Sequence, residues 1–187
     1  MNSSFKEKTF YLLHDEKVMC AAVSVIWTMQ NEILMIKRAE REGDPWSGHI
    51  GFPGGRLEES DKGNPFLTAV RETKEEVGVE LTANNCLREL TTLLPEKDFR
   101  GYKLELWPYL FKLEKPVSLI LDKDEVQEVV HVPIELVTNN FILKEGEFHL
   151  FSGDTYNLPY LELPNGERIW GLSLMILKEI NRLYSSA

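Results

Sequence analysis

Residues 52–79, which read FPGGRLEESDKGNPFLTAVRETKEEVGV, decide the fold of this chain. Asn64 is a residue type that caps helix N-termini, and Pro65 suits the first helical turn because no amide hydrogen is needed there. Gly78 is the residue type that most often follows the last residue of a helix. The stretch therefore predicts a helix over residues 65–77, preceded by a tight glycine turn and an acidic loop.

This predicted helix has two distinct faces. At about 100° per residue, Glu72, Glu75 and Glu76 fall within one arc of roughly 100°. A separate, mainly apolar stripe is expected to face the core and is formed by Phe66, Val70, Thr73 and Val77. A cluster of carboxylate oxygens is what a hard cation such as Mg²⁺ or Mn²⁺ requires. The competing interpretation is an ordinary solvated face, on which Arg71 and Glu75 form an i,i+4 ion pair.

The helix lies between two groups of predicted strands. Apolar runs rich in β-branched residues predict strands, and clusters of Gly, Pro and Asn separate them. The predicted strands cover residues 18–28, 33–37, 87–94, 103–113, 126–132, 141–148 and 160–163, and residues 40–51 form a loop. The same patterns predict a helical turn at 133–137 and a closing helix at 169–184. Because no linker divides the chain, we expect an α+β (mixed α/β) fold and one domain over residues 1–187.

Composition and charge limit the class of protein. The chain has 187 residues, of which 43% are apolar and 27% are charged, so it can bury a globular core. Its net charge of −9 has the wrong sign for a sequence-blind binder of long nucleic acid. Phosphate binding is still compatible with this charge if local cations reverse the field. The expected partner is therefore a small-molecule nucleotide and not a nucleic acid polymer.

Neither an export signal nor a membrane anchor is predicted. The first residues lack the apolar segment of a signal peptide, and the longest apolar runs, at 18–29 and 169–177, are interrupted and too short for a membrane span. Cys20 and Cys86 belong to no CxxC pair, so we expect two free thiols in a reducing compartment. These features predict a cytoplasmic location and no membrane partner.

The glycines, the acidic loop and a helix bearing Arg-Glu-x-x-Glu-Glu-x-Gly together resemble the signature of the Nudix hydrolase family. That signature is Gly, five residues, Glu, seven residues, then Arg-Glu-aliphatic-x-Glu-Glu-x-Gly-aliphatic. The matching positions are Gly55, Arg71, Glu72, Glu75, Glu76, Gly78 and Val79. The chain departs from the signature because Asp61 replaces the first Glu, Thr73 replaces the aliphatic residue, and the segment before Arg71 is two residues longer. We expect a bulge around Lys62-Gly63 to accommodate the longer segment.

The resemblance implies a fold, a metal site and a reaction class. Nudix proteins have a mixed sheet sandwiched between helices, an α/β/α arrangement, and generally hydrolyse a nucleoside diphosphate linked to another moiety. By carry-over, Mg²⁺ or Mn²⁺ would be held by Glu72, Glu75, Glu76 and the backbone carbonyl of Gly55. Arg71 would pair with a motif carboxylate and orient it. The candidate catalytic residues that the resemblance implies are Arg71, Glu72 and Glu75. The general base is one of these glutamates or an acidic residue of a later loop, for which the candidates are Glu125, Glu128 and Glu162.

Two further stretches resemble the coenzyme A diphosphatase-like members of the family. They are DPWSGHIGFPGGR at residues 44–56 and IWGLS at residues 169–173. They imply coenzyme A or one of its derivatives as substrate, cleaved to 3′,5′-ADP and a 4′-phosphopantetheine product. The coenzyme A signature upstream of the glycines is only partly present, so ADP-ribose, a nucleoside diphosphate sugar or another dinucleotide stays open. The candidate substrate-binding residues are Arg38, His49 and Arg56.

Two other function classes occur on the same fold. A nucleotide-binding module without turnover would have lost a metal carboxylate, and an isomerase of prenyl diphosphates would carry a catalytic cysteine within its own motif. All three helix carboxylates are present, and neither Cys20 nor Cys86 has such a flanking motif. The sequence therefore favours the hydrolase, and it leaves a homodimer open.

Overall fold

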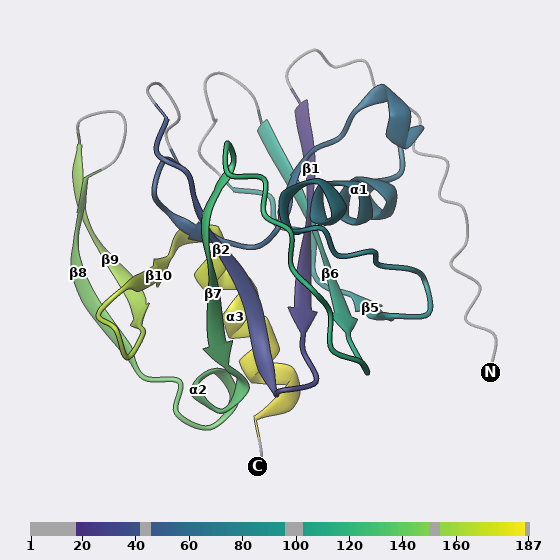
Figure 1. Ribbon diagram of the computed structural model, residues 1–187. Helices are drawn as coiled ribbons and strands as arrows, with labels where there is room; N and C mark the ends of the chain where they lie inside the picture. The colour runs from purple at the N-terminus through teal and green to yellow at the C-terminus, as the bar shows by residue number, and fades with distance from the viewer. Residues whose placement is uncertain (1–17, 42–45, 96–102, 150–153, 186–187) are drawn as a thin grey trace.

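A computed structural model describes residues 18–41, 46–95, 103–149 and 154–185 of the chain (Figure 1). The leading segment 1–17, on which the predicted location partly depends, lies outside the described residues. The strands are β1 (Val18–Trp27), β2 (Glu32–Arg38), β3 (Ile50–Gly51), β4 (Gly54–Arg56), β5 (Cys86–Glu89), β6 (Lys103–Lys112), β7 (Val126–Pro133), β8 (Leu143–His149), β9 (Thr155–Glu162) and β10 (Arg168–Trp170). The helices are α1 (Pro65–Val77), α2 (Ile134–Thr138) and α3 (Gly171–Tyr184), and a 3₁₀ turn, η1, spans Glu59–Asp61.

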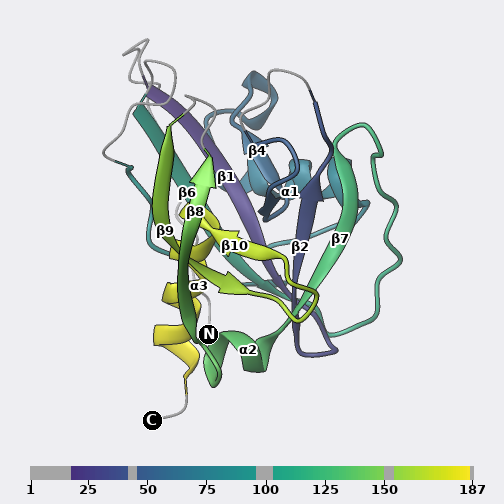
Figure 2. The same ribbon diagram turned by 90° about the vertical axis from the view of Figure 1, so that its left-hand side faces the viewer.

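The larger sheet is mixed, with β1 near its centre. β1 runs parallel to β6, from the pair Val18–Lys103 to the pair Trp27–Lys112, and antiparallel to β2 and β4. β2 also pairs with β3 and β7, while β5 lies at the edge beside β6. β8, β9 and β10 form a separate antiparallel sheet to one side of the larger one (Figures 1 and 2).

Helices cover both faces of the larger sheet. Successive residues of β1 point to opposite faces, so Ala22 and Ile26 belong to one core cluster and Val25 to the other. α1 contributes Ala69 and Val77 to the first cluster. The second cluster receives Leu174, Ile176, Leu177 and Ile180 from α3, and Leu161 and Ile169 from the smaller sheet. This arrangement confirms the predicted mixed α/β fold and its α/β/α layers.

The boundaries of α1 agree with the helix predicted from the sequence. The Asn64 side chain accepts a hydrogen bond of 3.0 Å from the Phe66 N–H, and Gly78 follows the helix with φ of +73°. In front of the helix, η1 is followed by Lys62 and Gly63, both with left-handed backbone, at φ of +53° and +73°. The expected bulge around Lys62-Gly63 is therefore present and brings the chain back to the start of α1.

The C-terminal part of the chain differs from its prediction. The closing helix was expected from residue 169, but Ile169 and Trp170 form β10, which pairs with Leu161 and Tyr160 of β9, and α3 begins at Gly171. An apolar run alone does not separate a buried strand from a buried helix, which explains the error. None of the described helices is both long and apolar enough to cross a membrane.

The strands also differ in extent from their predictions. β9 extends from residue 155, well before the predicted start at 160, because it pairs along its length with β8. The predicted strand 87–94 is divided into β5 and a bridge between Leu93 and Leu106. β3 and β4 have two and three residues, and the sequence gives no periodic signal over so short a length.

The connection between β6 and β7, residues 113–125, closes one end of α1. The Ile120 N–H donates to the Val77 carbonyl and the Asp122 N–H donates to the Glu76 carbonyl, each at 3.0 Å. The Ile120 side chain itself is 73% exposed. The connection thus satisfies carbonyl groups at the end of α1 that the helix leaves unpaired.

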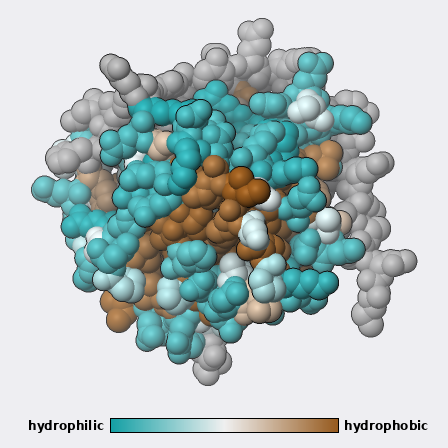
Figure 3. All heavy atoms as spheres, in the orientation of Figure 1, coloured by the Kyte–Doolittle hydropathy of each residue, from teal (hydrophilic) through white to brown (hydrophobic). Residues whose placement is uncertain are grey.

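Seen in the orientation of Figure 1, the surface has an apolar area in the middle of its face with hydrophilic residues around it (Figure 3).

Candidate active site

Two carboxylates of α1 meet a third from a distant part of the chain. Glu72 and Glu76 stand one helical turn apart, and Glu125 immediately precedes β7. Each offers one carboxylate oxygen, and these three oxygens lie within 4.8 Å of one another. The Glu125 carbonyl accepts a hydrogen bond of 2.8 Å from the Ala39 N–H, which ties the start of β7 to the end of β2. We call Glu72, Glu76 and Glu125 the acidic set; among the described residues, these are the carboxylates close enough to one another to face a single cation.

The structure separates the three later glutamates that the sequence left unranked. Only Glu125 joins the α1 carboxylates. Glu128 lies on β7 with its carboxylate 3.5 Å from Lys37 Nζ, and Glu162 pairs with Lys144 in the smaller sheet. The ranking follows from the path of the chain after β6, which no short motif encodes.

Glu76 is the most enclosed member of the acidic set, with 1% of its surface exposed. Its Oε2 accepts a hydrogen bond of 2.8 Å from the Gly54 N–H, and its Oε1 lies 4.0 Å from Arg38 Nη1. Burial raises the pKa of Glu76 to about 8, against the opposing effects of Gly54 and Arg38 and with the help of Glu72 and Glu125. The carboxylate charge is thus only partly compensated by the protein, and a divalent cation would compensate it.

Two glycines allow the backbone to approach both the sheet and the helix. At Gly54, where φ is +156°, an added Cβ would lie 2.3 Å from the Ala22 carbonyl oxygen of β1. At Gly55, an added Cβ would lie 2.4 Å from the Glu72 carboxylate. A side chain at either position would displace β4 from β1 or Glu72 from its place. The match of Gly55 to the family signature thus has a steric reason, while the part of its carbonyl in metal binding stays a prediction.

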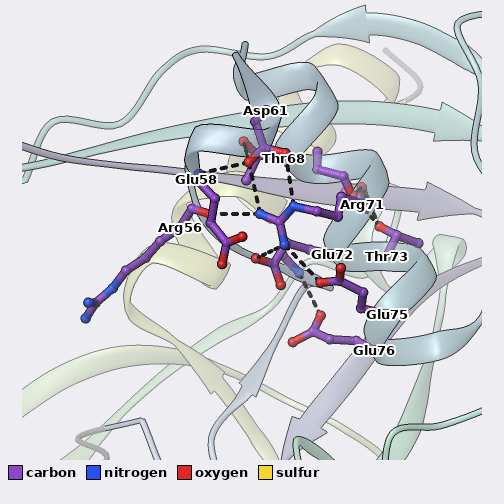
Figure 4. A network of polar contacts seen from close by, with 12 residues as sticks. Arg56, Glu58, Asp61, Thr68, Arg71, Glu72, Thr73, Glu75 and Glu76 are labelled. Atoms are coloured by element: carbon purple, nitrogen blue, oxygen red, sulfur yellow. Dashed lines mark hydrogen bonds and ion pairs between the residues drawn. The ribbon is translucent and has the colours of Figure 1, made fainter. Parts of the chain in front are cut away.

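Arg71 connects the carboxylates on the outer side of the site (Figure 4). Its Nε and Nη2 donate to the two carboxylate oxygens of Asp61 at 3.0 and 2.9 Å. Its Nη1 donates to Glu72 and to Glu75, each at 2.9 Å, and its Nη2 also donates to the Arg56 carbonyl at 3.1 Å. The expected ion pair with a motif carboxylate is therefore present, and it holds Glu72 in place.

Asp61 anchors Arg71 and is not a member of the acidic set. It is 2% exposed, and its Oδ2 also accepts hydrogen bonds from Thr68 Oγ1 at 2.8 Å and from the Glu58 N–H at 2.9 Å. Burial acts to raise the pKa of Asp61, but the hydrogen bonds from Arg71, Glu58 and Thr68 outweigh it and hold the pKa below its ordinary value. The signature position occupied by Asp61 thus serves Arg71.

Glu75 lies outside the acidic set. Its side chain is 55% exposed, and its Oε2 accepts the hydrogen bond from Arg71 Nη1. Figure 4 places it beside Arg71, on the side away from Asp61. Metal binding and catalysis by Glu75 stay predictions.

The three predicted substrate-binding residues differ in their relation to the acidic set. Arg38, at the end of β2, lies against Glu76. His49 is one step further away, because its carbonyl accepts a hydrogen bond of 3.0 Å from the Arg38 N–H and its ring lies 4.8 Å from the ring of Trp170. The Arg56 side chain extends away from the carboxylates of α1 (Figure 4).

The sequence did not single out Arg41, which also approaches the site. Its Nη1 lies 3.6 Å from Glu125 Oε1, and its N–H donates to Ser47 Oγ at 2.9 Å. Arg41 therefore links the segment before β3 to the acidic set. Its nearness to Arg38 in the sequence is the signal that could have found it.

Comparison with known proteins shows the family to which the chain belongs. The NUDIX domain family matches residues 19–151 of this chain. A probable nudix hydrolase of Schizosaccharomyces pombe is 31% identical over 152 residues, which cover 80% of this chain and 50% of that protein. The mitochondrial coenzyme A diphosphatase NUDT8 of Mus musculus is 30% identical over 156 residues, which cover 77% of this chain and 66% of that protein. The chain spans about half the length of the first curated relatives that it matches.

A solved structure shares the fold. The MutT/nudix family protein from Enterococcus faecalis superposes with a TM-score of 0.57 and 24% identity, over 92% of this chain and 64% of that one. The name of the mouse relative places that protein in the mitochondrion, so the cytoplasmic location expected for this chain stays a prediction.

Replacing Asp61 with Asn should lower the free energy of unfolding by about 2–4 kcal/mol, because the Arg71 guanidinium would lose the buried carboxylate to which it donates two hydrogen bonds. Since the pKa of Asp61 is lowered in the folded protein, its contribution is present above the ordinary carboxyl pKa and is lost as the pH falls through the lowered one. Urea unfolding from neutral to acidic pH should show the difference between wild type and Asp61→Asn narrowing in acid. The exposed neighbour Glu59, changed to Gln, is the control, and a difference that is constant with pH would contradict the expectation.

Without divalent cations, the protein should lose stability as the pH rises from about 5 to about 8, by roughly 1 kcal/mol per pH unit. The pKa of Glu76 is about 8 in the folded protein against an ordinary value of 4.5, so its contribution is full below the ordinary pKa and is lost as the pH rises through the folded one. Glu76→Gln should reduce this slope, to which Glu72 also contributes because burial raises its pKa, and should exceed the wild type in stability at the upper end of the range. Urea titrations in chelator test this, with exposed Glu80→Gln as the control, and equal slopes for wild type and Glu76→Gln would be the contrary result.

Proposed function

Since this chain belongs to the NUDIX family, we propose that it is a metal-dependent hydrolase of nucleoside diphosphate derivatives. The bond cleaved is the diphosphate bridge between the nucleoside side and another moiety. The proposal is carried by one observation, the three oxygens of Glu72, Glu76 and Glu125 within 4.8 Å of one another.

The donors of the acidic set suit Mg²⁺ or Mn²⁺. Both ions take carboxylate oxygens as ligands, and the pKa of Glu76, raised by burial, reflects a negative charge that the protein compensates only in part. When bound, the ion would neutralise charge on the diphosphate and lower the pKa of a water molecule. The Glu75 carboxylate and the Gly55 carbonyl stay candidates for further ligands.

The residues of the site divide the work. Glu72 and Glu76 would hold the cation, and Arg71 keeps Glu72 oriented through its hydrogen bond of 2.9 Å. Glu125, whose side chain is 40% exposed, is accessible to solvent and accepts the proton of the attacking water. This assignment rests on the position of Glu125 beside the α1 carboxylates, which Glu128 and Glu162 do not share.

Arg38 supplies the positive charge that an acidic protein needs at a phosphate site. Its guanidinium lies 4.0 Å from Glu76 Oε1, and a planar guanidinium can bind two phosphate oxygens at once. His49 acts through the loop that it supports against Trp170. Arg56 would have to reorient its side chain to reach the same phosphates.

The preferred substrate is coenzyme A or one of its derivatives. The two stretches that resemble the coenzyme A diphosphatase-like subgroup lie against each other, because the His49 ring is 4.8 Å from Trp170 and Ser173 Oγ donates to the Ile50 carbonyl at 3.2 Å. The mouse relative that is 30% identical is named as a coenzyme A diphosphatase. The products would be 3′,5′-ADP and a 4′-phosphopantetheine derivative, and ADP-ribose or a nucleoside diphosphate sugar is the alternative substrate.

A substrate panel distinguishes these cases. Coenzyme A, ADP-ribose and a nucleoside diphosphate sugar are incubated with Mg²⁺ or Mn²⁺ and, separately, with chelator, and the products are identified by mass spectrometry. We expect cleavage only with metal and the highest kcat/KM for coenzyme A. Preference for ADP-ribose would replace the substrate assignment, and binding of all three without product would identify a non-catalytic nucleotide-binding module.

Variants of three glutamates separate metal binding from proton transfer. Glu76→Gln should weaken Mn²⁺ binding and lower kcat by about 100-fold or more, because it removes a charged ligand. Glu125→Gln should lower kcat by about 100-fold while Mn²⁺ still binds, because it removes the proton acceptor. Glu128→Gln, on the strand that Glu125 precedes, is the matched control and should stay within about twofold of wild type. Unchanged turnover of Glu76→Gln would refute the metal assignment.

A further inference from the structure

Ser24 contacts both structural elements that supply the site. It lies in the middle of β1 and has none of its surface exposed. Its N–H donates to the Pro53 carbonyl at 2.8 Å, and its Oγ donates to the Ala69 carbonyl of α1 at 3.0 Å. Ser24 is thereby bonded to Pro53, which directly precedes β4, and to Ala69 of α1.

Thr73 completes the contact from the helix. It stands where the family signature has an aliphatic residue, and it too has none of its surface exposed. Its Oγ1 lies 2.7 Å from Ser24 Oγ and 2.7 Å from the Ala69 carbonyl oxygen. Buried hydroxyl groups are costly unless they are hydrogen-bonded, and here two hydroxyls share one carbonyl acceptor between β1 and α1.

These contacts connect the two elements that supply the acidic set and its backbone donor. Gly54 follows Pro53 directly and donates its N–H to Glu76 Oε2 at 2.8 Å. On α1, Thr73 lies between Glu72 and Glu76, and its hydroxyl bonds to the carbonyl of Ala69, one helical turn earlier. The position of the Gly54 N–H relative to the two helix carboxylates is therefore fixed through β1.

We propose that Ser24 is a positioning residue for the cation site, which its main-chain and side-chain hydrogen bonds assemble from two separate elements. It keeps α1 at the distance from Gly54 and Gly55 of β4 at which Glu72 and Glu76 could share one ion. The proposal rests on the metal-dependent function proposed above, and it adds a residue outside the family signature that prepares the site before the ion arrives.

If Ser24 only filled the core, its replacement would affect stability alone, whereas replacing a positioning residue should also weaken cation binding. In Ser24→Ala, the hydrogen bond that Ser24 Oγ donates to the Ala69 carbonyl and the one that it accepts from Thr73 Oγ1 are both lost. In Thr73→Val, which also removes one buried hydroxyl, the bond of 3.0 Å from Ser24 to Ala69 remains. The two variants are thus matched in chemistry and in burial, and they differ in whether this link between sheet and helix survives.

The test measures Mn²⁺ binding without substrate, by electron paramagnetic resonance, on the full chain. Ser24→Ala should weaken Mn²⁺ binding by about tenfold, the lower end of the range for direct partners of metal ligands, because Ser24 acts on the ligands through α1 and the segment before Gly54. Thr73→Val should stay within about threefold and Thr73→Ser close to wild type, while thermal unfolding in chelator should fall to a similar degree in Ser24→Ala and Thr73→Val. Steady-state kinetics on Ser24→Ala should show activity recovering at high Mn²⁺, because the ligands themselves are intact.

Each result decides between the proposals. Equal Mn²⁺ affinities in Ser24→Ala and Thr73→Val, with wild type binding the ion, would overturn the positioning role and leave the proposed function standing. A wild type that binds no Mn²⁺ and cleaves no diphosphate would overturn the proposed function, and with it the positioning role. If Ser24→Ala does not fold, Ser24→Cys keeps the volume with a weaker donor, and an Mn²⁺ affinity equal to that of wild type in this variant would refute the proposal.

Discussion

The burial of the Glu76 carboxylate is the constraint on which the site depends. A carboxylate with 1% of its surface exposed needs partners for its charge, and the protein supplies one backbone N–H from Gly54 and a guanidinium 4.0 Å away. Two further carboxylate oxygens lie within 4.8 Å, which makes the charge harder to hold. Close packing of Gly54 on β1 and of Gly55 on α1 keeps these groups in such an unfavourable arrangement, and a cation would turn that arrangement into a binding site.

The acidic groups around α1 fall into two classes by their partners. Asp61 is fully satisfied by Arg71, Thr68 and a backbone N–H, and its pKa is held low despite burial. Glu76 has fewer partners, and burial raises its pKa. Glu72 belongs to both classes, since it receives one hydrogen bond from Arg71 and still faces the acidic set. Arg71 thus orients Glu72 without neutralising the acidic set, and the remaining negative charge is what the proposed cation would compensate.

Elements whose ends are set by nearby residues were predicted correctly from the sequence, whereas elements that depend on pairing between distant strands were not. The ends of α1 follow from Asn64, Pro65 and Gly78, whose effects act within one helical turn. β10 was predicted as helix because its strand character comes from pairing with β9, and β3 and β4 are too short to leave a period. In the site, the glutamates of α1 were found by their spacing. The place of Glu125 depends on a connection that caps α1 and on a hydrogen bond from Ala39 to its carbonyl, and neither can be read from neighbouring residues.

The smaller sheet contacts the site through residues other than the acidic set and Arg71. Lys37, next to Arg38 on β2, binds Glu167 of the turn between β9 and β10 at 2.7 Å, and Trp170 of β10 lies against His49. The Phe148 ring of β8 stacks on Trp170 at 4.6 Å, so an aromatic row leads from the segment beside Arg38 into this sheet. Under the proposed function, the acidic set would recognise a feature common to all diphosphates, so selection among substrates would have to come from residues that contact the rest of the molecule. The elements fixed to the site by these contacts, the segment before β3 and the β8–β10 sheet, are the ones placed to provide it.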